Sequence, residues 1–237
     1  REMSDAFRHR DFDDFEGRQP NIVASKLALL RTAITLDGAR RTGRTISVGG
    51  GTGSFEQALS EEGIGVDLIV EPSVDLAVQS RARGFVVEQR PIQDVRLDDA
   101  SVDTIFYNGS AFGFIGDDDL AEVFAAHRLQ LTHDGVLALL DVPPSSALGV
   151  AVQASFEIPG DSYVRQVLRR SWYEDEVPHK EYWRTTEEYE RLLRGAGFTR
   201  FNTWQTLRRH PIYQNEVPED PVPGYREGSY VALVARR

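Results

Sequence analysis

The 237-residue sequence contains no cysteine. This absence excludes a disulfide framework, thiolate metal sites and a cysteine nucleophile. Long apolar runs are also missing, since no stretch approaches the roughly 20 residues that a membrane-spanning helix requires. The first residues are charged, whereas a secretory signal would be apolar. We therefore expect a cytoplasmic protein with no membrane partner.

Basic charge is scarce as well. The sequence has 27 Lys and Arg residues against 37 Asp and Glu residues, which gives a formal net charge of −10. Proteins that bind nucleic-acid phosphates usually carry a basic face, so this balance argues against a nucleic-acid partner. A composition of 41% hydrophobic and 27% charged residues is that of a globular protein. The length favours one domain, residues 1–237, over two.

Strand-like and helix-like patterns alternate along the chain. Helical spacing of apolar residues over 22–36 precedes the first strand, and further helical patterns separate the later strands. Such an alternation predicts an α/β fold with a mostly parallel sheet and helices on both faces. Strands are expected at 45–48, 66–70, 85–87, 102–107, 136–140, 201–207 and 230–235.

Two helix starts carry clear signals. Ser73 can cap a helix that ends near Gly84, and we expect Val74, Ala77 and Val78 to face inward. Residues 185–188 read as a capping box that opens a helix packed through Tyr189, Leu192 and Leu193. Between the fifth strand and this helix, residues 142–184 lose regularity. We interpret them as an insertion over the carboxyl edge of the sheet, covering a substrate.

A glycine loop follows the first strand directly and comprises Gly49, Gly50, Gly51, Thr52 and Gly53. A tight turn from strand to helix needs backbone angles that glycine adopts readily, and a side chain there would keep a ligand from the backbone. The loop therefore indicates a nucleotide-type cofactor. The dinucleotide pattern G-x-G-x-x-G or A fails, because Ser54 stands at its third glycine position.

Glu71 ends the second predicted strand, roughly 20 residues after the loop, where dinucleotide-binding folds carry a ribose-binding acid. A carboxylate at this place can accept hydrogen bonds from both vicinal hydroxyls of a ribose. NAD enzymes use the same acid, so Glu71 by itself does not choose between cofactors. The alternative is a solvated strand end.

Over roughly residues 20 to 235 the chain resembles the small class I S-adenosylmethionine-dependent methyltransferases grouped with the ubiquinone/menaquinone-biosynthesis type. Its tail, at 205–211 and 224–225, is similar to a small prokaryotic subgroup of unsettled substrate. The chain departs from the family at Ser47, where an acid is usual, and at Pro91, where Asp is common. The likeness rests on segments 48–55, 70–73, 99–103, 127–129, 134–135, 186–188 and 196–198.

The resemblance implies a Rossmann-like, seven-stranded sheet of order 3-2-1-4-5-7-6 with the last strand antiparallel. It also implies S-adenosylmethionine as the cofactor, with the glycine loop against its methionine and ribose parts. The remaining cofactor contacts implied are Glu71 at the ribose, Ile92 and Gln93 near the adenine, Asn108 beside the sulfonium, and Pro72.

The resemblance predicts methyl transfer to a small-molecule acceptor by in-line displacement, which the protein assists mainly by positioning the acceptor. A general base is needed only if the acceptor carries a proton, and the candidates are Asp141 and His210. Trp172, Tyr173 and Trp183 are candidates for lining the substrate pocket, although ordinary packing would also explain them.

Several alternatives stay open. A non-catalytic S-adenosylmethionine-binding or partner-binding module is the main rival, and a nicotinamide-dependent oxidoreductase is disfavoured by Ser54. A nucleic-acid methyltransferase is disfavoured by charge and by the sequence Asn-Gly-Ser-Ala at 108–111, where Asn-Pro-Pro-aromatic would be expected. No metal site is predicted. The oligomeric state is open, a homodimer included.

Overall fold

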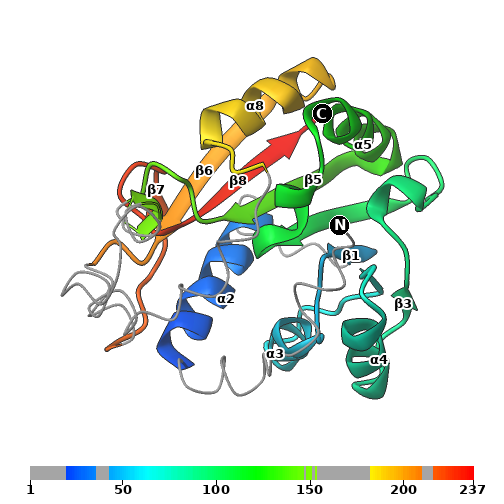
Figure 1. Cartoon of the computed structure of the whole chain (residues 1–237), viewed down its shortest axis with the longest axis horizontal. Helices are drawn as coiled ribbons and strands as arrows, with labels where there is room; N and C mark the ends of the chain where they lie inside the picture. The colour runs from blue at the N-terminus through cyan, green and yellow to red at the C-terminus, as the bar shows by residue number, and fades with distance from the viewer. Residues whose placement is uncertain (1–19, 36–42, 147, 151–152, 154–181, 210–215) are drawn as a thin grey trace.

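A computed structural model describes residues 20–35, 43–146, 148–150, 153, 182–209 and 216–237 (Figure 1). At its centre lies an eight-stranded sheet of order β3-β2-β1-β4-β5-β8-β6-β7. Strands β3, β2, β1, β4 and β5 are parallel, and β8 inserts antiparallel between β5 and β6. The expected fold class and strand order are confirmed, with one additional edge strand.

The strands are β1 (Thr45–Val48), β2 (Leu68–Val70), β3 (Val87–Glu88), β4 (Val102–Asn108), β5 (Leu131–Asp141), β6 (Arg200–Thr206), β7 (Val222–Pro223) and β8 (Tyr230–Arg236). The helices are α2 (Pro20–Ile34), α3 (Ser54–Glu61), α4 (Val74–Ala82), α5 (Asp117–Gln130) and α8 (Thr186–Gly195), with 3₁₀ turns η2 (Ile92–Asp94) and η3 (Gly109–Phe114). The additional strand, β7, has two residues and pairs with β6. Strand β5 begins five residues before its predicted start, directly after α5.

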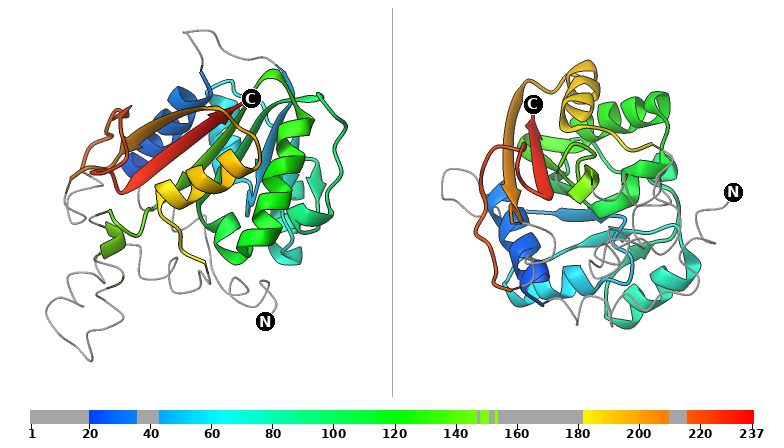
Figure 2. Two further views of the ribbon diagram at one scale, coloured as in Figure 1. Left: turned by 90° about the horizontal axis from the view of Figure 1, so that it is seen from above. Right: turned by 60° about the vertical axis from the view of Figure 1, so that its left-hand side comes forward.

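Helices cover both faces of the sheet. Helices α2, α3 and α4 lie on one face, and α5 and α8 lie on the other (Figures 1 and 2). Neighbouring residues of β5 alternate between the two cores: Ala138 and Leu140 join the cluster with α2 and α3, while Leu137 and Leu139 join the cluster with α5 and α8. The period of two is the one that a strand imposes on its side chains, so β5 is apolar on both sides.

Helix α4 shows a different face to the core from the one expected. Leu76, Ala77 and Ser80 are buried, whereas Val74 and Val78 are 55% and 56% exposed. The prediction was therefore right for Ala77 and wrong for the two valines. A hydrogen bond explains this orientation of α4. The Ser80 hydroxyl donates to the Gly51 carbonyl of the glycine loop at 2.8 Å, so the side of the helix that carries Ser80 faces inward.

Helix α8 begins as the sequence predicts. The Thr185 side chain accepts from the backbone N–H of Glu188, and the Glu188 side chain accepts from the backbone N–H of Thr185. This capping box satisfies two of the N–H groups that a helix start leaves without partners. Tyr189 and Leu193 are buried against the sheet, so the helix is fixed both at its start and along its face.

Within the described ranges, no helix is long and apolar enough to cross a membrane. Most of the expected insertion at 142–184 falls outside the described residues, so its proposed covering of a substrate remains a prediction.

Candidate cofactor and acceptor site

Parallel strands end at one edge of the sheet and bring the candidate residues together there. In the register, Val48 of β1 lies beside Val70 of β2 and Tyr107 of β4, and Asn108 of β4 lies beside Leu140 of β5. The residues at or just beyond these pairs are consequently neighbours along that edge: the glycine loop, Glu71, Asn108 and Asp141.

The glycine loop uses its glycines for backbone geometry. Gly49, Gly51 and Gly53 have φ angles of 74°, 57° and 81°, in the left-handed region that other residues avoid. The Gly49 N–H donates to the carbonyl of Val70 at 2.8 Å, which ties the loop to β2. Thr52 is buried. The loop therefore turns the chain from β1 into α3 with its backbone toward the sheet edge.

Glu71 joins the loop to the end of β2. Its Oε2 accepts from the Gly51 N–H at 2.9 Å, and its Oε1 accepts from the Ser73 N–H at 2.8 Å. The side chain is 6% exposed. Burial raises the pKa of Glu71, and the hydrogen bonds from Ser73 and Gly51 oppose that rise. A carboxylate can accept about four hydrogen bonds, so this one keeps acceptor capacity for a ligand.

Two features of this edge fit a cofactor such as S-adenosylmethionine. A Cβ added to Gly51 would meet no atom within 4 Å, so the space in front of the loop is open. Asn108 places a buried Oδ1 at the end of β4, and this oxygen has no hydrogen-bond partner among the described residues. Leaving such an acceptor unpaired costs about 1–3 kcal/mol, which an N–H donor of a ligand would offset.

The residues expected at the adenine and ribose lie near this edge in different environments. Ile92, the first residue of η2, is buried in the core, while Gln93 and Pro72 are half-buried. Arg96 donates to the Gln93 carbonyl at 2.7 Å, which holds η2 in place. Of the two expected adenine contacts, Gln93 is thus the one with side-chain surface to offer.

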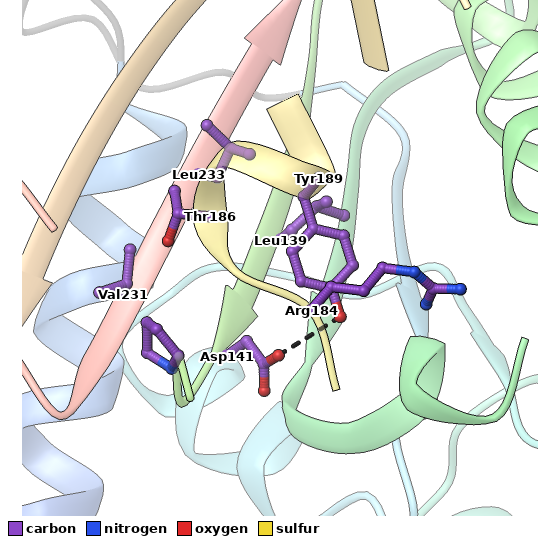
Figure 3. Close-up of a pocket in the computed structure, with 8 residues that line it drawn as sticks. Leu139, Asp141, Arg184, Thr186, Tyr189, Val231 and Leu233 are labelled. Atoms are coloured by element: carbon purple, nitrogen blue, oxygen red, sulfur yellow. Dashed lines mark hydrogen bonds between the residues drawn. The ribbon is translucent and has the colours of Figure 1, made fainter. Parts of the chain in front are cut away.

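Asp141 ends β5 beside a tyrosine that sequence reasoning had assigned only to packing. Asp141 is 6% exposed, its Oδ1 accepts from the Val142 N–H at 2.8 Å, and its Oδ2 accepts from the Tyr189 hydroxyl at 3.5 Å (Figure 3). Burial, and then the negative charge of Asp141, raise the pKa of Tyr189. Tyr189 therefore stays protonated and acts as a donor to Asp141.

Arg184 fixes the chain that leads into α8. Its guanidinium donates to Asp117 Oδ1 at 2.8 Å and to the carbonyls of Phe112 and Ile115 at 3.3 and 2.7 Å. In Figure 3 the guanidinium points away from Asp141, toward η3. Arg184 thus forms an ion pair with Asp117, and Asp141 lines a cavity of about 10 Å³, room for about one water molecule.

Trp183 binds the backbone of Val142, the residue that follows Asp141. Its indole N–H donates to the Val142 carbonyl at 2.7 Å, so it joins the two ends of the segment between β5 and α8. The other aromatic candidates, Trp172 and Tyr173, and the second candidate base, His210, lie outside the described residues. In the part of the chain that the structure describes, no group of three or more acidic or histidine side chains could hold a metal ion.

A buried pair behind the loop escaped sequence reasoning. The Ser47 hydroxyl donates to Glu56 Oε1 at 2.6 Å, and both residues are 0% exposed. A carboxyl group is therefore present near position 47, although it comes from α3 and not from β1. One feature of the sequence could have indicated this pair. Glu56 is a charged residue that directly follows Phe55 and stands three positions before Leu59, and both of these are core residues.

No protein-family model matches the sequence, and no curated protein does. Solved structures share its fold. A Thermotoga maritima S-adenosylmethionine-dependent methyltransferase, described as a possible histamine N-methyltransferase, matches with a TM-score of 0.71 and 24% identity, over 94% of this chain and 93% of that one. An Archaeoglobus fulgidus S-adenosylmethionine-dependent methyltransferase matches with a TM-score of 0.63 and 14% identity, over 96% and 100%.

The plantazolicin methyltransferase BpumL, in complex with a pentazolic desmethylPZN analogue and S-adenosylhomocysteine, matches with a TM-score of 0.62 and 11% identity, over 95% of this chain and 89% of that one. At these identities the similarity concerns the fold. The chain thus has the Rossmann-like fold of S-adenosylmethionine-dependent methyltransferases along nearly its whole length.

Proposed function

We propose that this protein is an S-adenosylmethionine-dependent methyltransferase that acts on a small-molecule acceptor. The observation that carries the proposal is the open space at Gly51, flanked by the Glu71 carboxylate and by the Asn108 oxygen, which has no partner among the described residues. The methyltransferase fold of the neighbours supports the same function. The grouping with the ubiquinone/menaquinone type rests on the sequence segments alone and is part of the proposal.

Each residue at the edge would have a separate task. The backbone of the glycine loop would contact the methionine and ribose parts, Glu71 would accept from the ribose hydroxyls, and Asn108 would lie at the sulfonium end. Gln93 would contact the adenine. These contacts bind and orient, which is the main requirement of an in-line displacement.

When bound, S-adenosylmethionine would supply an electrophilic methyl group, and its sulfur would leave with the bonding electron pair. The acceptor atom would form the new bond to carbon, and any proton on that atom would have to leave. Asp141 is the described acid at the carboxyl end of β5, and it would take this proton directly or through the one water that its cavity can hold. Tyr189 would orient the Asp141 carboxylate.

The net charge of the chain and one of the structural neighbours both favour a small acceptor. The net charge of −10 disfavours a polyanionic acceptor such as a nucleic acid. The Thermotoga neighbour is described as a possible histamine N-methyltransferase, and histamine is a small amine. We therefore expect small uncharged or cationic molecules to be the first acceptors worth testing.

Cofactor binding tests the proposal with a matched pair of glycine variants. Gly51 and Gly84 both have positive φ, and a Cβ at either would meet no atom within 4 Å, but only Gly51 belongs to the loop. Gly51→Ala and Gly84→Ala should each cost about 1 kcal/mol of folding free energy, because alanine is strained at such angles. Only Gly51→Ala should weaken S-adenosylhomocysteine binding, by about tenfold or more in calorimetric titration.

Wild-type protein that binds neither S-adenosylmethionine nor S-adenosylhomocysteine would refute the proposed function. Tight binding without turnover of any acceptor in a broad panel would favour the non-catalytic module.

Asp141→Asn tests the base. The assay needs an acceptor that the wild-type protein methylates. At saturating cofactor, this variant should produce S-adenosylhomocysteine at least about tenfold more slowly than the wild type, since a positioned base contributes that much or more. Asp134→Asn, on the same strand but exposed, should leave the rate unchanged. If Asp141→Asn reacts at the wild-type rate, Asp141 is not the base.

A further inference from the structure

Glu56 is an unusual residue for its place in the fold. It lies in the first turn of α3 and is 0% exposed, between the apolar core residues Phe55 and Leu59. Its Oε1 accepts a hydrogen bond of 2.6 Å from Ser47 on β1, which is also 0% exposed. The carboxyl group lies near the N-terminus of the helix, whose dipole favours the negatively charged form.

Burial of a carboxylate is expensive. Even when it is hydrogen-bonded, moving the charge out of water costs several kcal/mol, and an apolar or amide side chain would fill the same space at less cost. Packing of α3 alone therefore does not explain a glutamate here. A role for its charge does.

The carboxylate lies directly behind the glycine loop. A Cβ on Gly50 would be 3.1 Å from Glu56 Oε1 and 2.7 Å from the Cγ2 of Ile69, so position 50 must lack a side chain for the carboxylate to approach the loop. On its other sides the loop is held by Glu71, at the Gly51 N–H, and by Ser80, at the Gly51 carbonyl. Glu56 thus places a carboxyl group at short range from the loop backbone at Gly50.

We propose that Glu56 is a positioning residue that makes the glycine loop selective for the cationic amino-acid part of the cofactor. Inside a protein, charges interact more strongly than in water, so a buried carboxylate beneath the loop favours an ammonium lying against it. Ser47 holds the carboxylate in this orientation. The inference rests on the proposed function, because it concerns the same cofactor.

The test compares two ligands that differ in the amino-acid part. S-adenosylhomocysteine carries the α-ammonium, whereas 5′-methylthioadenosine keeps the adenosine and the thioether sulfur and lacks the amino-acid group. Glu56→Gln keeps the shape and removes the charge. We expect it to weaken S-adenosylhomocysteine binding about tenfold in calorimetric titration and to leave 5′-methylthioadenosine binding unchanged. Its thermal unfolding midpoint checks that the variant is folded.

Two further variants complete the design. Glu61→Gln, on the same helix but exposed, should bind both ligands like the wild type. Ser47→Ala keeps the carboxylate and removes its donor, so we expect a smaller loss that is again confined to S-adenosylhomocysteine. This second variant carries the test if Glu56→Gln does not fold.

Equal losses for the two ligands would overturn the inference, because they would show that Glu56 supports the loop only mechanically. Unchanged binding of both ligands by Glu56→Gln would overturn it as well. Failure of the wild type to bind S-adenosylhomocysteine is a different result, since it removes the proposed function itself.

Discussion

Replacing Glu71 with alanine should weaken S-adenosylhomocysteine binding at least roughly 100-fold. In the structure the two carboxylate oxygens are held by the Gly51 and Ser73 N–H groups, so their remaining lone pairs are fixed in direction. Hydrogen bonds to a charged group contribute about 1.5–3 kcal/mol each, and the loss of two of them amounts to at least about 3 kcal/mol. The Gly51 N–H would also lose its partner, which loosens the loop.

The matched control is Glu88→Ala. Glu88 ends the next strand, β3, and pairs with Arg90 at the surface, so its removal should change neither binding nor stability appreciably. Calorimetric titration of the three proteins measures the effect, and the unfolding midpoint checks the fold. A folded Glu71→Ala protein with wild-type affinity would show that the ribose is held elsewhere.

The second large effect concerns stability and pH, and it comes from a buried histidine. His127 of α5 is 2% exposed, its Nδ1 lies 2.9 Å from Gln130 Oε1, and its Nε2 lies 2.7 Å from the Tyr107 hydroxyl. A neutral ring satisfies both contacts by donating to Gln130 and accepting from Tyr107. Burial lowers the pKa of His127 to about 4, and the hydrogen bond that the ring donates to Gln130 opposes this change.

The sign follows from proton binding. Between about pH 6.5 and pH 4 the unfolded chain binds a proton at His127 that the folded protein does not bind, so unfolding becomes easier as the pH falls. The full contribution over this interval is about 3 kcal/mol, present above pH 6.5 and lost by about pH 4. Urea unfolding at several pH values measures it.

His127→Gln should be less stable than the wild type at neutral pH, because it loses part of the buried contacts, yet its stability should fall less between pH 6.5 and 4. His133→Gln replaces an exposed histidine on β5 and should keep the wild-type pH dependence. Equal pH slopes for His127→Gln and the wild type would show that other groups cause the acid sensitivity.

Local sequence signals predicted the glycine loop, the place of Glu71 and the start of α8. The glycine loop and Glu71 belong to consecutive strand ends, and neighbouring parallel strands must end at one edge, so their proximity followed from the order of the elements. The capping box of α8 is likewise a local pattern over four residues. Such features depend on short stretches of backbone geometry, which a sequence specifies directly.

The face of α4 shows where local signals were insufficient. Val74 and Val78 lie one turn apart and suggested a buried stripe, but both are exposed. What decided the orientation was the contact of Ser80 with a carbonyl 29 residues earlier in the chain. A hydrogen bond of this kind has no periodicity that a sequence can reveal.

The sequence patterns by themselves determined the α/β class and the edge at which Glu71 meets the glycine loop, and the resemblance to the methyltransferases implied the order of the strands. Only the tertiary structure decided which polar groups meet there: Tyr189 with Asp141 across 48 residues, and Ser47 with Glu56 across the loop. Patterns of spacing report which face of an element is apolar. Pairing of buried polar groups depends on how the elements pack, and each such group must find a partner that packing places within reach.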